Sequence, residues 1–154
     1  MRGSQPMRLV SRSGDECGIE DSAAPIHDAQ GRLSGVVLVF HDVTEQRRLD
    51  REMRWRASHD LLTGLLNRGE FDRRLQQVLQ RSREEGTRHA LLYLDLDQFK
   101  LINDACGHPT GDRLLLQIGQ LLGDCVRPGD TLARLGGDEF GVLLERCGVH
   151  QAQR

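Results

Sequence analysis

One stretch constrains the fold of this chain more than any other: Arg134–Leu144, in which apolar segments flank Gly136-Gly137-Asp138-Glu139. Adjacent glycines can adopt the positive φ angles that short hairpin loops need, so the stretch predicts two antiparallel strands joined by a tight turn. Two acidic residues follow at the tip, where packing gives no reason for them. Carboxylates on a rigid turn can hold a divalent cation and the phosphates that it carries. The alternative is an ordinary solvated hairpin, and the turn by itself fits both interpretations.

Composition narrows the class of protein. The chain has 154 residues, a length that fits one medium domain or a small domain plus a fragment. Its formal net charge of −2 gives no sign of nucleic-acid binding. Its longest apolar runs, such as Val36–Phe40, are far too short to span a bilayer, and the N-terminus does not read as a signal peptide. The four cysteines form no Cys-x-x-Cys pair. We therefore expect a cytoplasmic protein with reduced cysteines, no membrane segment and no nucleic-acid partner.

Residues 7–42 have the pattern of a small antiparallel sheet. Strands are expected, between turn sequences rich in Gly, Ser and Asp, at Met7–Val10, Cys17–Ile26 and Gly35–Phe40. Three strands cannot cover a core by themselves, so residues 1–42 are interpreted as the C-terminal fragment of a domain. The segment Asp42-Val43-Thr44-Glu45-Gln46 resembles the signature that closes PAS sensor domains and leads into a signalling helix. An ordinary helix N-terminus, with Asp42 or Thr44 as its cap, fits the same residues.

A charged, helix-forming segment follows at residues 43–58. Leu49, Met53 and Ala57 recur every four residues over about two heptads, which is too short a pattern to establish a coiled coil. We therefore predict a helical linker, and its pairing in a dimer is a hypothesis.

Residues 59–154 alternate helical and strand patterns. Asn67 or a neighbour can cap a helix that ends at Gly86, and His89–Leu94 is a nearly continuous apolar run, expected to form a strand buried on both faces. A short helix to Ala105 and a loop at Gly107–Asp112 then lead into a long helix. Its buried stripe is expected to contain Leu114, Ile118, Leu121, Leu122 and Cys125. Together with the hairpin, this order predicts an α+β domain with an antiparallel sheet and helices on one face.

Asp95 stands at the end of the first strand of this domain. If that strand lies beside the hairpin, Asp95 and Asp138 can face each other across a cation. Magnesium usually takes one or two carboxylates together with substrate phosphates. A helix starting near Asp97 and Gln98 would direct backbone N–H groups at those phosphates, with Asp97 expected to cap the helix rather than to bind metal. The residues thus predict a site for magnesium and phosphate.

Five motifs, in one order and spacing, carry a family resemblance. They are Asp60-Leu61-Leu62-Thr63-Gly64-Leu65-Leu66-Asn67-Arg68, Asp95–Lys100, Asn103-Asp104, Gly107–Asp112 and Arg134–Phe140. From about Ala57 to the C-terminus they resemble GGDEF-domain diguanylate cyclases, whose fold is similar to the palm of nucleotidyl cyclases and polymerases. The resemblance implies that two GTP molecules condense to cyclic di-GMP with release of pyrophosphate.

The same resemblance implies a metal and catalytic site. Asp95, Asp138 and the carbonyl of Leu96 would bind Mg²⁺ or Mn²⁺. Glu139 would assist at the metal and at the reacting hydroxyl, which must lose its proton. Gly136 and Gly137 would let the backbone approach GTP closely.

Further residues are implied in substrate binding. Asn103 and Asp112 would read the guanine base, whose edge offers matching donors and acceptors. The terminal phosphates would meet the backbone N–H groups of Gln98, Phe99 and Lys100. Simpler roles fit some of these residues as well: Asn103 could stabilise a turn, Asp112 could favour a helix N-terminus, and the Lys100 side chain could lie along its helix. His108 is expected to be structural.

A second site is implied for the product. Arg127-Pro128-Gly129-Asp130 is an ordinary turn sequence, but its Arg-x-x-Asp lies at the family's spacing for an inhibitory site. Arg127 would stack on or pair with the guanine and phosphate of cyclic di-GMP, Asp130 would accept hydrogen bonds from the guanine, and Arg134 would add a contact. The resemblance therefore implies feedback inhibition by the product.

The domain organisation expected from the sequence is a PAS-like fragment at 1–42, a signalling-helix linker at 43–58, and a GGDEF domain at 59–154. The family pattern continues past the hairpin with another helix and further strands, so we expect this domain to be truncated at its C-terminus and the 154-residue chain to be a poor cyclase. Because one domain holds one GTP, catalysis is expected to need a homodimer. The alternative is a non-catalytic module that binds GTP or cyclic di-GMP and regulates a partner.

Overall fold

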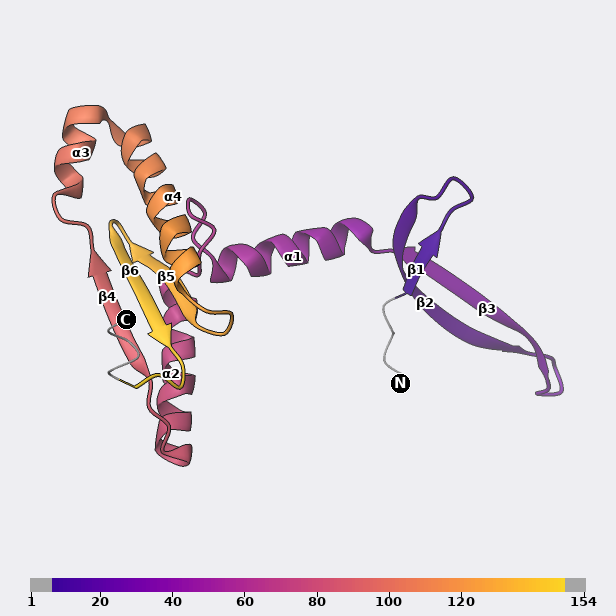
Figure 1. Cartoon of the computed structure of the whole chain (residues 1–154). Helices are drawn as coiled ribbons and strands as arrows, with labels where there is room; N and C mark the ends of the chain where they lie inside the picture. The colour runs from indigo at the N-terminus through magenta and orange to yellow at the C-terminus, as the bar shows by residue number, and fades with distance from the viewer. Residues whose placement is uncertain (1–6, 149–154) are drawn as a thin grey trace. The chain divides into compact units, whose positions relative to one another are not determined.

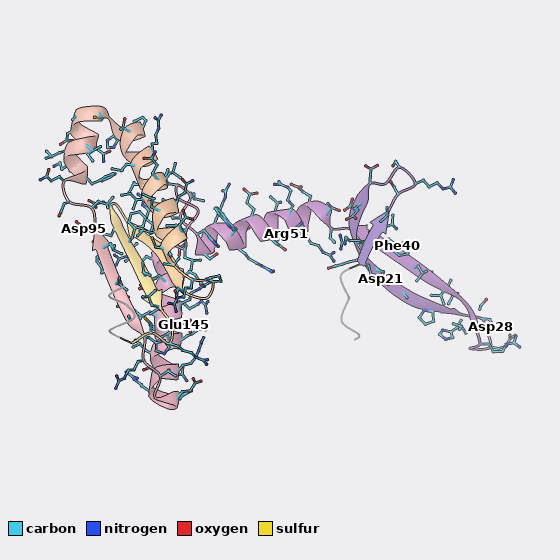
Figure 2. All side chains as sticks on the ribbon, viewed as in Figure 1. Asp21, Asp28, Phe40, Arg51, Asp95 and Glu145 are labelled. Carbon is cyan, nitrogen blue, oxygen red and sulfur yellow. The ribbon has the colours of Figure 1, made fainter. Side chains whose placement is uncertain are left out.

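The computed structural model describes residues 7–148, and the chain divides between Arg54 and Trp55 into two compact units (Figure 1). The first unit holds an antiparallel sheet in the order β1-β2-β3, formed by β1 (Met7–Val10), β2 (Glu16–His27) and β3 (Leu33–Asp42). Asp28, at the far tip of the β2-β3 hairpin (Figure 2), accepts hydrogen bonds from the backbone N–H groups of Gln30 and Arg32, both 2.9 Å long. All three strands expected from the sequence are therefore present, and β2 and β3 are longer than expected.

Helix α1 (Thr44–Ser58) begins where β3 ends. The Asp42 carboxylate accepts the backbone N–H of Thr44 at 2.8 Å, and the Thr44 hydroxyl accepts the backbone N–H of Gly18 at 2.8 Å. The capping expected of Asp42 is thus confirmed, and Thr44 ties the start of α1 to β2. No residue of α1 is buried. None of the helices within residues 7–148 is long and apolar enough to cross a membrane.

A second antiparallel sheet organises the unit from Trp55 onward. Its strands β4 (Ala90–Asp95), β5 (Thr131–Gly136) and β6 (Glu139–Leu144) lie in the order β4-β6-β5. The first strand therefore pairs directly with the hairpin, which meets the condition for Asp95 and Asp138 to lie near each other. This pairing brings the end of β4 to the turn between β5 and β6 (Figure 1).

Helix α2 (Arg68–Glu85) has the boundaries that its caps predict. Asn67 accepts the backbone N–H of Glu70 with its side chain, and Gly86 ends the helix in the left-handed conformation. Its buried side chains Phe71 and Val78 form a core with residues of β5 and β6: Ala133, Leu135 and Leu143. A Cβ at Gly141 would lie 2.8 Å from the Phe71 ring, so glycine there lets the helix approach the sheet.

The helices cover both faces of the sheet, not one face as expected. On the face opposite the α2 core, Leu92 of β4 and Val142 of β6 line a cavity of about 440 Å³ together with Leu122 of helix α4 (His108–Cys125). The strand β4 is not buried on both faces either, because α2 packs over β5 and β6 and leaves Leu91 and Tyr93 more than half exposed. The apolar run at residues 89–94 therefore predicted a strand correctly, but this strand lies at the edge of the described sheet.

Two details of the α3–α4 hairpin differ from the expectation. Helix α3 (Phe99–Cys106) ends at Gly107, and α4 begins at the next residue, so the expected loop is the first turn of α4. Pro109 fits there because the N–H groups of a first helical turn have no intrahelical partner. The buried residues of α4 are Gly111, Leu115 and Gly119, whereas Leu121 is 65 % exposed. Of the expected stripe, Leu114, Ile118 and Leu122 are half-buried, and Cys125 is exposed like Leu121. Gly111 lets α4 approach α3, and Gly119 lets it approach the loop before α2.

Candidate active site

The hairpin turn has the backbone that its glycines predict. Gly136 and Gly137 have φ angles of 139° and 55°, and the two-residue turn is Gly137-Asp138. The pairing of β5 with β6 shifts register between Arg134 and Gly136, which marks a β-bulge just before the turn. Both glycines lie in the region of φ where an L side chain would be strained. The turn therefore fixes the backbone at Asp138, which lies within it, and at Glu139, the first residue of β6.

The acidic residues of the two strands meet at this end of the sheet. Asp95, labelled at the end of β4 in Figure 2, lies directly opposite Glu139 in the β4–β6 register, and Asp138 precedes Glu139 in the turn. Reduced hydration, followed by the negative charges of Asp138, Glu139 and Asp97, raises the pKa of Asp95. A divalent cation would relieve this repulsion, so the donor set fits a magnesium-type ion. Among the residues that the structure describes, no group of three or more His, Cys, Asp and Glu side chains is arranged to hold a metal ion, so a cation at Asp95 and Asp138 would need further ligands from substrate and water.

One arginine joins the hairpin to the start of α2. The Nε of Arg68 donates to the Leu135 carbonyl at 3.0 Å, and its Nη2 donates to Glu139 Oε2 at 3.1 Å. The same Nη2 lies 3.4 Å from the Tyr93 hydroxyl. Hydrogen bonding to Glu139 raises the pKa of Tyr93. Glu139 is thus held by Arg68, with Tyr93 beside the pair, and sequence reasoning placed neither Arg68 nor Tyr93 at the site.

A second arginine fixes the turn from its other side. Arg134 donates to the Gly137 carbonyl through Nε at 3.0 Å and Nη2 at 2.7 Å, and through Nη1 to the Asp60 carboxylate at 3.1 Å. Burial raises the pKa of Asp60, but hydrogen bonds from Thr63 and Arg134 outweigh it and hold that pKa below its usual range. With its side chain 13 % exposed, Arg134 supports the turn; the product contact expected of it stays a prediction.

The start of α3 has an unusual backbone. Gln98 is its N-cap residue, with φ at 63°, and no side chain caps the helix, so Asp97 does not have the capping role expected for it. The Phe99 N–H donates to the Leu96 carbonyl at 3.2 Å, which closes the turn between β4 and α3. A left-handed conformation in a residue other than glycine is uncommon and frequently marks a functional loop. The structure places this turn directly after Asp95; contact with phosphates stays a prediction.

Asn103 and Gly111 lie against each other where α3 and α4 pack. The Oδ1 of Asn103 is buried and has no hydrogen-bond partner. A Cβ at residue 111 would overlap that oxygen, so only glycine leaves room for the amide in this position. Asp112 follows on α4 with an exposed side chain. An unpaired buried amide oxygen is costly, so this position of the Asn103 side chain has no stabilising hydrogen bond at Oδ1 in the structure.

Arg127 and Asp130 form the turn that leads into β5. Asp130 accepts the backbone N–H of Arg127 at 3.1 Å and that of Glu145 at 3.2 Å. Both residues line the cavity between α4 and the sheet. The ordinary turn role is therefore present, and the inhibitory role stays a prediction.

Sequence profiles of two families match the chain. The family described as "Diguanylate cyclase, GGDEF domain" matches residues 57–154, and the family described as "PAS fold" matches residues 2–48. The first match covers every candidate site residue named above, and the second covers the three-stranded sheet and the start of α1.

Individual proteins agree with these profiles. The probable diguanylate cyclase DgcE of Escherichia coli is 44 % identical over 149 residues, which is 97 % of this chain and 14 % of that protein. The cyclic di-GMP phosphodiesterase PdeB of Shewanella oneidensis is 40 % identical over 136 residues, 88 % of this chain and 15 % of that protein. The crystal structure of the coiled coil and GGDEF domain of DgcB from Caulobacter crescentus, in complex with cyclic di-GMP, superposes with a TM-score of 0.66 at 34 % identity and covers 70 % of this chain and 56 % of that one. The chain thus spans about one seventh of the length of these two curated relatives.

Proposed function

The chain belongs to the GGDEF-domain family of diguanylate cyclases, and on that premise we propose that it provides one half of a site that joins two GTP molecules into cyclic di-GMP. The observation that carries this proposal is the pairing of Asp95 with Glu139 across β4 and β6, with Asp138 in the adjoining turn. In the reaction a 3′-oxygen forms a bond to the α-phosphorus of the other nucleotide while the bond from that phosphorus to the departing pyrophosphate breaks.

The acidic residues of the site have different roles in this reaction. Asp95, Asp138 and the Leu96 carbonyl hold the metal, with Glu139 beside them. A bound Mg²⁺ or Mn²⁺ ion supplies neutralisation of phosphate charge and polarisation of the reacting phosphorus. Glu139 accepts the proton that the attacking 3′-hydroxyl loses, because an alkoxide is the better nucleophile.

Substrate binding is assigned to α3 and α4. The Asn103 amide and the Asp112 carboxylate read the guanine. The backbone N–H groups at Gln98, Phe99 and Lys100 accommodate the terminal phosphates beside the metal, with the Phe99 N–H shared between phosphate and the Leu96 carbonyl to which it donates in the structure. Gly136 and Gly137 leave the hairpin backbone open to close approach by the nucleotide.

The wider assembly follows from this chemistry. One site holds one GTP, so a two-fold homodimer brings two sites together.

Cyclic di-GMP binds at Arg127 and Asp130 and inhibits the enzyme. We assign residues 1–42 to a PAS-type sensor, 43–58 to a signalling helix and 59–154 to the cyclase domain, and we place the reaction in the cytoplasm, where GTP is available.

The proposal is tested by incubating purified protein with GTP and Mg²⁺ and measuring cyclic di-GMP and pyrophosphate, both for this chain and for any longer form that contains it. Asp138→Ala and Glu139→Ala should each lower turnover by roughly a hundredfold or more, the scale of losing a metal ligand or a general base. Glu85→Ala, at the exposed end of α2, controls for the lost charge. Nucleotide binding without turnover in any form would identify the non-catalytic regulatory module instead.

A further inference from the structure

Arg68, the first residue of α2, makes its side-chain contacts with the sheet and not with its own helix. Its guanidinium contacts the Leu135 carbonyl on one arm of the hairpin, the Glu139 carboxylate on the other arm, and the Tyr93 hydroxyl on the neighbouring strand. These three partners come from β5, β6 and β4 respectively. A single side chain thus spans the end of the sheet at which the acids meet.

The base of this side chain is rigid. Asn67, the residue before Arg68, accepts the N–H of Glu70 at 3.0 Å and donates its amide to the Ala57 carbonyl at 2.9 Å. Leu66 accepts the backbone N–H of Arg134 at 2.9 Å, which anchors the same segment to β5. Arg68 therefore reaches the hairpin from a point whose position is fixed relative to the sheet.

We propose that Arg68 is a positioning residue that holds the Glu139 carboxylate in its reactive orientation and offsets the negative charge of the Asp95, Asp138 and Glu139 cluster. The inference rests on the proposed function, since it assigns Arg68 a part in the same reaction. The two tasks separate chemically. Orientation depends on two nitrogens of one planar group bonding two different partners, whereas charge balance depends only on a positive charge nearby.

The two tasks predict opposite effects of removing the side chain. Without Arg68, three carboxylates lie together with less positive charge beside them, so a divalent cation should bind more tightly. Glu139 would lose a hydrogen bond that fixes its orientation, so the chemical step should slow. A residue that merely stabilised the fold would weaken metal binding and turnover together.

Metal affinity is measured first, by titrating the 154-residue chain with Mn²⁺ and recording the free ion by electron paramagnetic resonance. We expect Arg68→Ala to bind Mn²⁺ roughly two- to fourfold more tightly, a small change because exposed charges are screened. Arg68→Lys keeps the charge and should match the wild type. The control is Arg73→Ala: Arg73 lies on the same helix, its side chain is 53 % exposed against 56 % for Arg68, and it pairs with Glu70. Weaker Mn²⁺ binding by Arg68→Ala, or an equal gain in the Arg73→Ala control, would overturn the charge-balance argument.

Turnover is measured second, in a form of the protein that makes cyclic di-GMP. Arg68→Ala should lower kcat about tenfold while KM for GTP changes less than about twofold, the scale of one charge-assisted hydrogen bond. Arg68→Lys should fall in between, because an ammonium cannot bond the Leu135 carbonyl and Glu139 in the same geometry. Unchanged kcat in Arg68→Ala, or a loss explained by a lower unfolding midpoint, would overturn the inference. If the wild type makes no cyclic di-GMP and Asp138→Ala changes nothing, the proposed function itself fails, and the Mn²⁺ titration still decides the charge balance.

Discussion

Gly111 is the residue whose size decides where Asn103 can be. Replacing it by alanine would place a methyl group on the Asn103 Oδ1 and 3.1 Å from the Phe99 ring. Because the methyl displaces the amide proposed to read guanine, Gly111→Ala should weaken GTP binding roughly five- to tenfold, which corresponds to about one lost hydrogen bond. Isothermal titration calorimetry with a non-hydrolysable GTP analogue measures this change.

The matched control lies on the same helix. A Cβ at Gly123 meets nothing within 4 Å, so Gly123→Ala should leave GTP affinity unchanged and raise the free energy of unfolding by about 0.5–1 kcal/mol through helix propensity. Equal nucleotide affinity of the Gly111→Ala and Gly123→Ala variants would contradict the placement of Asn103 in the guanine site.

Single residues also show how far the sequence could lead. The conformation of Gly136 and Gly137 was predictable, because adjacent glycines before a polar tip have few other uses. The contact between Arg68 and Glu139 was not, since the two residues are 71 positions apart and no periodicity relates them. The only available signal was that Arg68 stands beside Asn67 in a motif already noted. The capping role predicted for Asp97 was wrong because the N-cap residue of α3 is Gln98. No local sequence pattern indicates the left-handed backbone of Gln98.

At the scale of elements, helix α2 carries an ion pair whose strength depends on pH. Both Nε and Nη2 of Arg73 donate to Glu70, and Arg74 adds a further bond. Hydrogen bonds first from Arg73 and then from Arg74 lower the pKa of Glu70 from 4.5 to about 2. Because the folded-state pKa is depressed, the pair stabilises the fold fully above pH 4.5, and this stability is lost as the pH falls toward and through about 2.

The Glu70→Gln variant tests this dependence. Its free energy of unfolding should be lower than that of the wild type by about 0.5–1 kcal/mol near pH 6, as for other partly exposed pairs. The difference should close between pH 4.5 and about 2, as urea unfolding curves at several pH values would show. A double-mutant cycle with Arg73→Ala isolates the pair. A coupling energy that stayed constant down to pH 2 would contradict the assignment.

The order of the elements along the chain was more predictable than which of their faces are buried. Caps at Asn67 and Gly86 bounded α2 closely, and the hairpin with a preceding strand implied the β4-β6-β5 neighbourhood. The start of α4 was missed because Gly107 ends one helix and begins the next, which looks like a loop in sequence. Apolar β4 was expected to be buried on both faces, but burial depends on which strands a helix covers, and that is a property of the assembled sheet.

At the scale of the whole molecule, the proposed chemistry requires two chains, and α1 offers an exposed apolar stripe for their pairing. Leu49 and Met53 are one helical turn apart and are 41 % and 69 % exposed. Apolar side chains at this spacing on an exposed helix are typical of a surface that pairs with a second helix. We expect the same face of a second copy to cover them, because a two-fold interface uses one patch twice.

The double variant Leu49→Gln/Met53→Gln should therefore raise the dimer dissociation constant at least tenfold, as sedimentation equilibrium would show, since two apolar side chains per chain lose their burial. Cyclic di-GMP formation per chain should fall in dilute protein and recover as the concentration rises, because the reaction sites themselves are intact. Arg51→Gln is the control: residue 51 lies about 200° around the helix from Leu49, so it should leave both quantities unchanged. An unaltered dissociation constant in the double variant would show that α1 does not assemble the dimer. Full turnover by the wild type at concentrations where sedimentation finds only monomer would contradict the two-chain site.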